Sequence, residues 1–445
     1  MKNHTLPHLG VLLLLGTGMG IGMGALAHAD TAGTGQTQAH KSPATLHPTH
    51  RAHHAAGSHT ASAHASVSHT VSRPVSEARA YPRATAHAVV TTARSTRSAH
   101  LVLASRRTRI SSRYAERFTA SSFTDVDNLT SGDITTGEDP VVRAAAIEAL
   151  GNMNGTALAI DPSSGRVLAM VNQKLALSSG AEPCSTIKLS VALAALDEGI
   201  VTRDTPVNLG GGYHLTLTEA LAHSNNLYFE TLGRSLGFER VKHYANQFGL
   251  GELAGYNIQG EQLGAYPDHE LPAAQGGVGR MCSFGESVSM TPLQLGALVS
   301  AIANGGTLYY LQHPQTPEEI AGFEPRVKRI LNIAPLLPDM KEGMAAAVQY
   351  GTARSLRTSF NTFPVMGKTG TCSNNGTRYG WFGSYADTPT GRIVTVIFLE
   401  GGRPTFGPKA AELTGQFYRA LADRNYFEPR VPAASEAGAT TTGAQ

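Results

Sequence analysis

The sequence predicts an α+β fold, with a five-stranded antiparallel sheet flanked by helices and an inserted all-helical subdomain. Three observations predict it: a helix and a strand hairpin open the folded region, a long helical stretch follows, and three strand-like runs close it. A helix followed by a hairpin is typical of the start of an α+β domain. We therefore expect the two ends of the region to complete one sheet.

The first elements follow from capping and turn residues. Asp139-Pro140 before VVRAAAIEAL predicts an N-capped helix with proline in its first turn. Two β-rich runs, 156–160 and 166–171, are joined by Asp-Pro-Ser-Ser-Gly and predict a hairpin. The next run, STIKLSVALAALDEG, has helical composition, which places Ser185 at a helix N-terminus.

The middle and the end of the region differ in periodicity. LTLTEALAHSNNLYFETLGRSLGFERVKHYANQFGLG alternates helical runs with glycine stops and predicts the helical subdomain. TPLQLGALVSAIA predicts a further helix, capped by Thr291 and ended by residues 304–306. FPVMGKTGT, YGWFGSYA and RIVTVIFLEG then predict three strands, and a helix follows around 409–422.

The folded domain is expected over residues 138–429, with disordered segments on both sides. Residues 30–137 form a predicted linker, made mostly of Ala, Ser, Thr, His, Arg and Pro in its larger part, which buries too little to offset its ordering entropy. A similar tail is expected at 430–445. The linker is basic, which favours either a solvated tether or attraction to an anionic envelope polymer or membrane surface. No nucleic-acid partner is expected.

The first 29 residues predict export. Lys2 is followed by an apolar run over 9–26 and by Ala27-His28-Ala29, which together are typical of a cleaved signal peptide. The run also approaches the ~18–20 residues of a membrane span, so an uncleaved anchor is the alternative. Both interpretations place the domain outside the cytoplasm, on the periplasmic side or outer face of the membrane.

The strongest chemical signal is Ser185-Thr186-Ile187-Lys188. A serine hydroxyl attacks a carbonyl only if a nearby base removes its proton. On a helix, residues i and i+3 share a face, so the Lys188 amine can reach Ser185. A neutral lysine requires burial and a neighbouring cation, for which Lys368 is the candidate. Alone, this pattern also fits a solvated lysine after a serine.

Two further segments supply complementary groups. Ser224-Asn225-Asn226 offers a hydroxyl for proton relay and, at Asn226, an amide that can hold a substrate carbonyl. The run Lys368-Thr369-Gly370-Thr371 heads a predicted strand, where an ammonium and hydroxyls can bind a carboxylate and glycine permits close approach. Taken singly, the two segments also fit an ordinary turn and a strand end.

In order, the three segments resemble the S-x-x-K, S-D-N and K-T-G motifs of penicillin-binding proteins and class A β-lactamases, with Asn225 replacing the aspartate. The flanks AIDPSSGRVLAMV, SMTPLQLGALVSAIANGG and GWFGSYA resemble the transpeptidase domain of penicillin-binding proteins, over roughly residues 140–424. The resemblance implies a β-lactamase/transpeptidase-like fold, peptidoglycan stem peptides ending in D-Ala-D-Ala as substrate, and β-lactam binding. It implies no cofactor and no metal.

The resemblance also assigns roles. It implies catalytic roles for Ser185, Lys188, Ser224, Asn226 and Lys368, and substrate binding by Asn226, Lys368, Thr369, Gly370 and Thr371. Acyl transfer requires an oxyanion hole, which the family builds from the backbone N–H groups that match Ser185 and Thr371.

That oxyanion hole bears on the cysteines. If the two N–H groups converge, Cys184 and Cys372 lie within the ~4.4–6.8 Å Cα separation that a disulfide tolerates, and export favours oxidation. We therefore predict a Cys184–Cys372 disulfide, similar to the bridge of carbapenem-hydrolysing class A β-lactamases. Two free thiols are the alternative. Cys282 is expected to be a buried thiol.

Some positions depart from the family. Cys184 stands where glycine is usual, Glu286 stands where glutamine is usual, and the spacing from Ser185 to Ser224 is short. The leading prediction is a D,D-transpeptidase that acts through an acyl-enzyme. A D,D-carboxypeptidase or endopeptidase would use water as acceptor. A β-lactamase of class A needs an E-x-x-L-N segment, which is absent between the last two motifs. A non-turnover β-lactam sensor or envelope scaffold is the alternative of another class.

Overall fold

A computed structural model describes residues 117–428 of the 445-residue chain. The predicted signal segment 1–29, residues 30–116 of the predicted linker and the predicted tail 430–445 lie outside the described residues.

The central element is a five-stranded sheet in the order β2-β1-β9-β8-β7, with every neighbouring pair antiparallel. Its strands are β1 (Gly155–Asp161), β2 (Arg166–Val171), β7 (Val365–Asn374), β8 (Thr377–Thr388) and β9 (Gly391–Gly401). Strands from the two ends of the domain meet where β1 pairs with β9. The predicted fold class and the predicted strand hairpin are confirmed.

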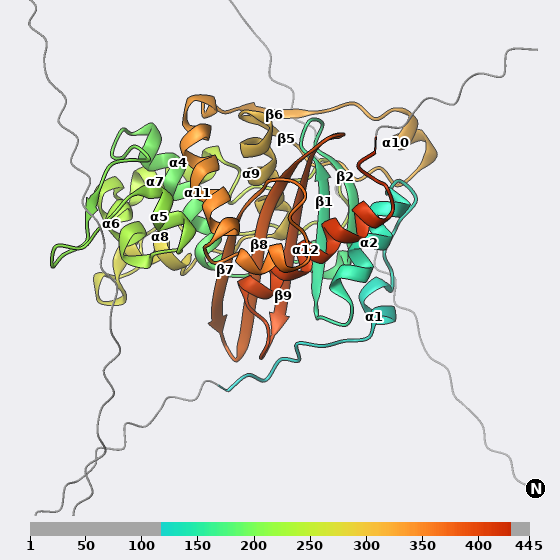
Figure 1. Ribbon diagram of the computed structural model, residues 1–445, viewed down its shortest axis with the longest axis horizontal. Coiled ribbons are helices and arrows are strands. Elements are labelled where there is room, and N and C mark those ends of the chain that lie inside the picture. Colours follow the sequence, from blue (N-terminus) through green and yellow to red (C-terminus); the bar gives the residue numbers. More distant parts are fainter. Residues whose placement is uncertain (1–116, 429–445) are drawn as a thin grey trace, which may run out of the picture. The chain divides into compact units, whose positions relative to one another are not determined.

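Helices cover both faces of the sheet (Figure 1). On one face, α2 (Pro140–Leu150) and α12 (Gly407–Asp423) share a hydrophobic core with β1 and β8. On the other face, α9 (Pro292–Asn304) packs against the sheet within a second core. The caps are those predicted: the Asp139 side chain accepts from two backbone N–H groups of α2, and Thr291 forms a capping box with Gln294.

A helical subdomain lies beside β7 (Figure 1). It contains α4 (Lys188–Asp197), α5 (Leu217–Ala222), α6 (Asn226–Leu236), α7 (Phe238–Gln247) and α8 (Gly277–Phe284). Its apolar residues, among them Leu193, Leu221, Phe229 and Leu232, are buried in the second core. The predicted inserted helices are therefore present, between β2 and β7 in the chain.

Shorter elements complete the described part. The helices are α1 (Val126–Thr130), α3 (Gln173–Ala176), α10 (Pro317–Ala321) and α11 (Leu337–Gln349). The small strand pairs are β3 (Val207–Asn208) with β4 (His214–Leu215), and β5 (Thr307–Tyr309) with β6 (Val327–Ile330). Four 3₁₀ turns are η1 (Cys184–Ile187), η2 (Ala273–Gln275), η3 (Ala334–Leu336) and η4 (Arg354–Thr358).

The folded part begins earlier than the predicted linker end at residue 137. Phe123 forms a β-bridge with Met153, and α1 follows. The Arg143 guanidinium on α2 binds the Asp133 carboxylate at 2.7 Å and the Glu138 carboxylate at 2.8 Å. The Asp133 ion pair and the backbone hydrogen bonds of Thr119 and Thr124 hold residues 117–137 against the domain. Composition alone could not predict such long-range partners.

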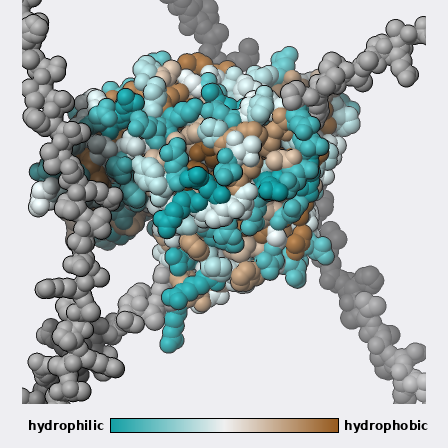
Figure 2. Space-filling view, in the orientation of Figure 1, coloured by the Kyte–Doolittle hydropathy of each residue, from teal (hydrophilic) through white to brown (hydrophobic). Residues whose placement is uncertain are grey.

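The described surface carries no broad apolar layer on the face seen in Figure 2, where hydrophilic residues surround separate hydrophobic ones. Within residues 117–428, no helix has both the length and the apolar character that a membrane crossing requires.

Candidate active site

Ser185 lies on η1, directly before α4, where the sequence predicts the first turn of an α-helix. The first turn is 3₁₀ because Cys184 has a φ of 50° and the Thr186 N–H donates to the Pro183 carbonyl oxygen at 3.1 Å. The turn still places residues three apart on one side. The Lys188 Nζ lies 3.0 Å from the Ser185 Oγ.

Both lysines of the predicted site converge on one serine. The Lys188 Nζ lies 3.1 Å from the Ser224 Oγ, and the Lys368 Nζ lies 2.8 Å from the same oxygen. Lys188 also donates to the Asn226 Oδ1 at 2.7 Å and to the Ser224 carbonyl oxygen at 2.7 Å. Five predicted residues from three distant segments, Ser185, Lys188, Ser224, Asn226 and Lys368, are thus linked by direct contacts.

Burial shapes the charge of both lysines, whose side chains are fully buried. Burial lowers the pKa of Lys188 well below its usual value, and the nearby charge of Lys368 lowers it further. Burial also lowers the pKa of Lys368 to about 7. A neutral amine can accept a hydroxyl proton, so Lys188 has the electrostatic setting of a general base.

The Ser-Asn-Asn segment links α5 to α6. Ser224 has a φ of 56°, which turns the chain sharply between the two helices. The Asn225 side chain caps α6 by accepting from the Tyr228 N–H at 2.9 Å. Asparagine and aspartate are equally good N-caps. The replacement of the motif's usual aspartate by Asn225 therefore keeps this structural role.

Strand β7 brings the third motif against η1. A Cβ added at Gly370 would lie 2.8 Å from the Pro183 carbonyl oxygen, so glycine allows this close approach. The Thr369 hydroxyl donates to the Thr352 Oγ1 at 2.7 Å, and the Thr371 Oγ1 accepts from the Gly407 N–H at 2.8 Å. The sequence did not predict a site role for Thr352, although it stands in a Gly-Thr-Ala segment similar to the family.

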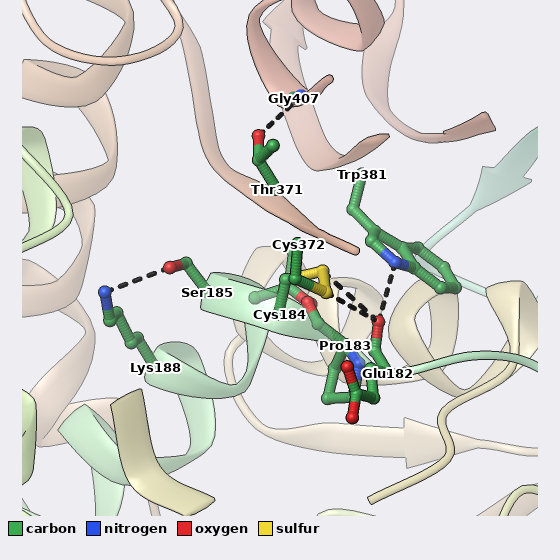
Figure 3. The surroundings of a disulfide bond; sticks show 10 residues. Glu182, Pro183, Cys184, Ser185, Lys188, Thr371, Cys372, Trp381 and Gly407 are labelled. Atoms are coloured by element: carbon green, nitrogen blue, oxygen red, sulfur yellow. Dashed lines mark hydrogen bonds between the residues drawn. A yellow bond between two sulfur atoms is a disulfide. The ribbon is translucent and has the colours of Figure 1, made fainter. Parts of the chain in front are cut away.

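The predicted Cys184–Cys372 disulfide is present, with a Cα–Cα distance of 5.5 Å and a sequence separation of 188. Figure 3 shows the bridge joining the turn of Ser185 to the strand of Thr371. Beside it, the Trp381 Nε1 donates to the Glu182 carbonyl oxygen at 3.0 Å. Each predicted oxyanion residue is therefore the sequence neighbour of a bridged cysteine. Cys282 is a buried free thiol, as predicted.

The unusual Glu286 has a partner on α8. Its carboxylate forms an ion pair with the Arg280 guanidinium, which also stacks over the Phe284 ring at 4.0 Å. Burial and, to a smaller extent, the charge of Glu286 raise the pKa of Glu182, which lies on the loop before the nucleophile. The Arg280 charge partly offsets this rise. A carboxylate at position 286 is thus accommodated by a local ion pair.

A hollow of about 820 Å³ lies away from this cluster, at the β8–β9 turn. Two of its charged residues, Asp387 and Arg392, bind each other at 2.6 Å. The chemistry of the buried lysines therefore favours the Ser185 cluster as the candidate active site.

Comparison with known proteins agrees with this geometry. Residues 155–419 match the family model of the penicillin-binding protein transpeptidase domain. The chain belongs to this family. The matched residues lie within the predicted domain and include the whole Ser185 cluster.

Among curated relatives, Stage V sporulation protein D of Bacillus subtilis is 31% identical over 258 residues, which is 48% of this chain and 39% of that protein. The peptidoglycan D,D-transpeptidase MrdA of Acinetobacter baumannii is 25% identical over 64% of this chain and 53% of its own. The chain thus spans about half or less of these relatives.

Solved structures support the fold of this transpeptidase-family domain. The structure of Pseudomonas aeruginosa PBP2 aligns with a TM-score of 0.56 and 23% identity, over 67% of this chain and 77% of that chain. At this identity the likeness shows the fold alone.

Proposed function

We propose that this protein is a peptidoglycan D,D-transpeptidase that forms an acyl-enzyme at Ser185 with stem peptides ending in D-Ala-D-Ala. The observation that carries the proposal is the contact of the Ser185 Oγ with the buried Lys188 amine at 3.0 Å, beside a Ser224 hydroxyl that contacts both lysines. The family membership and the relatives named as D,D-transpeptidases support it.

Acylation begins when neutral Lys188 accepts the Ser185 hydroxyl proton. The Ser185 Oγ bonds to the carbonyl carbon of the penultimate D-Ala, and the carbonyl electrons move onto its oxygen. Collapse of this tetrahedral oxyanion breaks the C–N bond. The departing D-Ala amine takes the proton from Lys188 through the Ser224 hydroxyl, which leaves an ester at Ser185.

Other residues hold the substrate during this step. The backbone N–H groups of Ser185 and Thr371 stabilise the oxyanion. Lys368, together with the Thr369 hydroxyl, binds the terminal carboxylate of the peptide, while Asn226 holds an upstream carbonyl. Gly370 leaves room for the peptide beside β7.

Release of the acyl group needs an acceptor. An amine of a second stem peptide attacks the ester carbonyl, and its proton returns to the Ser185 oxygen by way of Lys188, so that an amide crosslink forms. We propose that the protein acts after export, with residues 1–29 as signal or anchor and with its basic segment attracted to an anionic envelope polymer or membrane surface. β-Lactams would enter the same site and acylate Ser185.

The experiment is time-resolved labelling with a fluorescent penicillin, applied to the wild type and to Ser185→Ala. Wild type is expected to become covalently labelled, whereas Ser185→Ala stays unlabelled because it lacks the nucleophile. Thr352→Ala serves as a matched control, since it removes a neighbouring hydroxyl and leaves the nucleophile in place. It is expected to label, more slowly.

The time course separates the alternatives. Slow loss of the label supports a penicillin-binding transpeptidase, and rapid loss supports a β-lactamase. Incubation with a pentapeptide donor, with and without an added amine acceptor, distinguishes transpeptidation from carboxypeptidase hydrolysis. A wild type that no concentration of penicillin labels would overturn the proposal.

A further inference from the structure

Three polar side chains form an exposed cluster where α5 meets the end of α11. The Tyr350 hydroxyl donates to the Glu219 Oε1 at 2.7 Å, and the His223 Nε2 lies 3.3 Å from the Glu219 Oε2. The ring centres of His223 and Tyr350 are 5.7 Å apart. The side chains of His223 and Glu219 are 55% and 42% exposed, and Tyr350 is 43% exposed, so a solute can reach all three.

The two helices α5 and α11 pack against each other beside this cluster (Figure 1). The Thr352 N–H, just beyond α11, donates to the Ala222 carbonyl oxygen at the end of α5 at 3.0 Å. Gly351 lies against the same carbonyl group, and a Cβ at this position would collide with it. The two helix ends are therefore fixed relative to each other.

This junction lies on the side of the site that holds the leaving group. His223 directly precedes Ser224, the proposed proton relay, and Tyr350 stands two residues before Thr352. The Thr352 Oγ1 accepts from the Thr369 hydroxyl at 2.7 Å. Consecutive Cα atoms are about 3.8 Å apart, so the cluster starts within one or two residues of Ser224 and of the neighbour of Thr369.

The position of the cluster bears on the acyl acceptor, a step that rests on the proposed function. There the leaving D-Ala has its amine at the Ser224 hydroxyl and its carboxylate at Lys368 and Thr369. Attack of an amine on the Ser185 ester reverses the expulsion of an amine, so the acceptor nitrogen enters where the leaving nitrogen left. The acceptor therefore approaches from the side on which the cluster lies.

The carboxylate of the cluster lacks a permanent cation. In the described part of the chain, Glu219 forms no ion pair with a lysine or an arginine, whereas the Glu252 carboxylate lies 2.6 Å from the Lys328 Nζ. Burial and the Glu219 carboxylate raise the pKa of Tyr350 to about 12, so its hydroxyl keeps its proton and stays a donor. A carboxylate has about four lone-pair positions, and those not facing Tyr350 and His223 remain open to a cation.

The chemistry of an acceptor amine matches these groups. A primary alkyl amine is an ammonium ion at neutral pH, and it must lose a proton before it can attack an ester. A carboxylate beside an aromatic ring attracts an alkyl ammonium. Imidazole side chains gain and lose protons near neutral pH, and the His223 ring lies against the same carboxylate.

We propose that Glu219, Tyr350 and His223 form the entry site for the cationic amine of the acyl acceptor. Glu219 attracts the ammonium group, and the Tyr350 ring contacts it. Neutral His223 takes one ammonium proton and later releases it to solvent. The neutral amine then attacks the Ser185 ester, and its second proton goes to the Ser185 oxygen as in the proposed crosslinking step.

The test follows two products of one acyl-enzyme in the full-length protein. A donor peptide ending in D-Ala-D-Ala is incubated with Nα-acetyl-lysine amide, whose side chain is an ammonium ion, or with hydroxylamine, which is uncharged at neutral pH. For each amine, the amount of aminolysis product is divided by the amount of hydrolysis product. Both products arise from the same acyl-enzyme, so this product ratio does not depend on the rate of acylation.

In Glu219→Gln the product ratio with the lysine amide is expected to fall roughly 2- to 5-fold, as for the loss of one exposed charge pair. In His223→Gln it is expected to fall roughly 10-fold or more, because a general base is removed. With hydroxylamine both variants are expected to keep the wild-type product ratio. Glu239→Gln and His243→Gln change exposed residues of α7 and are the matched controls, expected to behave as the wild type with both amines.

Thermal unfolding and penicillin labelling show that each variant is folded and forms an acyl-enzyme. An unchanged lysine-amide product ratio in folded Glu219→Gln would overturn the entry site, and so would an equal fall with both amines, which would mark a structural effect on α5. A wild type that penicillin labels but that makes no product with the lysine amide would overturn it as well. Absence of penicillin labelling in the wild type would instead contradict the proposed function itself.

Discussion

Two buried lysine amines contact one serine hydroxyl at the centre of the candidate site. Ser224 lies 3.1 Å from the Lys188 Nζ and 2.8 Å from the Lys368 Nζ. If Lys188 and Lys368 were both protonated, their two buried ammonium groups would repel each other strongly, so protonation of one lysine disfavours protonation of the other. The arrangement favours one neutral and one protonated lysine, which are the forms that a base and a carboxylate binder require.

This pairing predicts a bell-shaped pH dependence for the second-order rate constant of penicillin acylation. On the acid side the rate falls as Lys188 becomes protonated; because its pKa is lowered, this occurs well below the usual lysine value of 10.5. On the alkaline side the rate falls above about pH 7, where the empty site loses the Lys368 proton. Stopped-flow labelling across pH measures both limbs.

Variants assign the two limbs. Lys188→Ala is expected to lower the rate constant by roughly 10²–10⁴-fold, as for loss of a general base. Lys368→Ala is expected to bind the penicillin carboxylate weakly and to lose the alkaline limb, since the titrating group is gone. A Lys188→Ala variant as active as the wild type, or an alkaline limb that persists without Lys368, would contradict these roles.

At the scale of elements, the disulfide between η1 and β7 fixes the geometry of the candidate oxyanion hole. Cys184 has a φ of 50°, a conformation that favours glycine, which is the usual residue of the family at this position. The bridge and the hydrogen bond from Trp381 to the Glu182 carbonyl hold this turn against the sheet. The covalent bond to Cys372 thus holds Cys184 in a positive-φ conformation that glycine would adopt without strain.

Loss of the bridge is expected to affect both stability and acylation. In Cys372→Ala, the free energy of unfolding should fall by about 2–4 kcal/mol, and penicillin acylation should slow because the Ser185 turn is no longer held beside Thr371. Cys184→Gly should acylate faster than Cys184→Ala, since glycine adopts the positive φ without strain. Denaturant unfolding and labelling rates measure the two effects.

Reduction provides the matched control. A phosphine reductant should lower the stability of the wild type and of Cys282→Ala by similar amounts, because Cys282 is outside the bridge, and should leave Cys372→Ala unaffected. If reduction changes neither unfolding nor acylation of the wild type, the bridge has no role in positioning the site.

Elements with local signals could be predicted from the sequence. The helix caps at Asp139 and Thr291 and the five strands all follow from contiguous residues, and they are confirmed. The ordered motifs also predicted the cluster of Ser185 with Lys188. The 3₁₀ form of the first turn was not predicted, because it depends on the conformation of Cys184 against β7.

Contacts between distant segments could not be predicted in the same way. Thr352 meets Thr369 because α11 ends beside β7. Its Gly-Thr-Ala segment is similar to the family, but the segment alone does not indicate this contact. The start of the folded part was also predicted too late, since Asp133 is held by an ion pair with Arg143 that composition does not encode.

At the scale of the whole molecule, one sheet joins the two ends of the domain around the helical insertion. Ser185 and Thr371 are far apart in the chain, and the pairing of β1 with β9 and the Cys184–Cys372 bridge bring their segments together. The candidate site therefore exists only in the folded domain. A short peptide that carries Ser185-Thr186-Ile187-Lys188 has none of the partners that lower the pKa of Lys188.

The most direct test of the central claim is mass spectrometry of the full-length protein after reaction with benzylpenicillin, followed by peptide mapping. The account predicts a mass increase equal to one penicillin per chain, located on the peptide that contains Ser185 and absent when the protein is unfolded before the reaction. An adduct on another residue, or an unmodified Ser185 in folded protein at saturating penicillin, would contradict it.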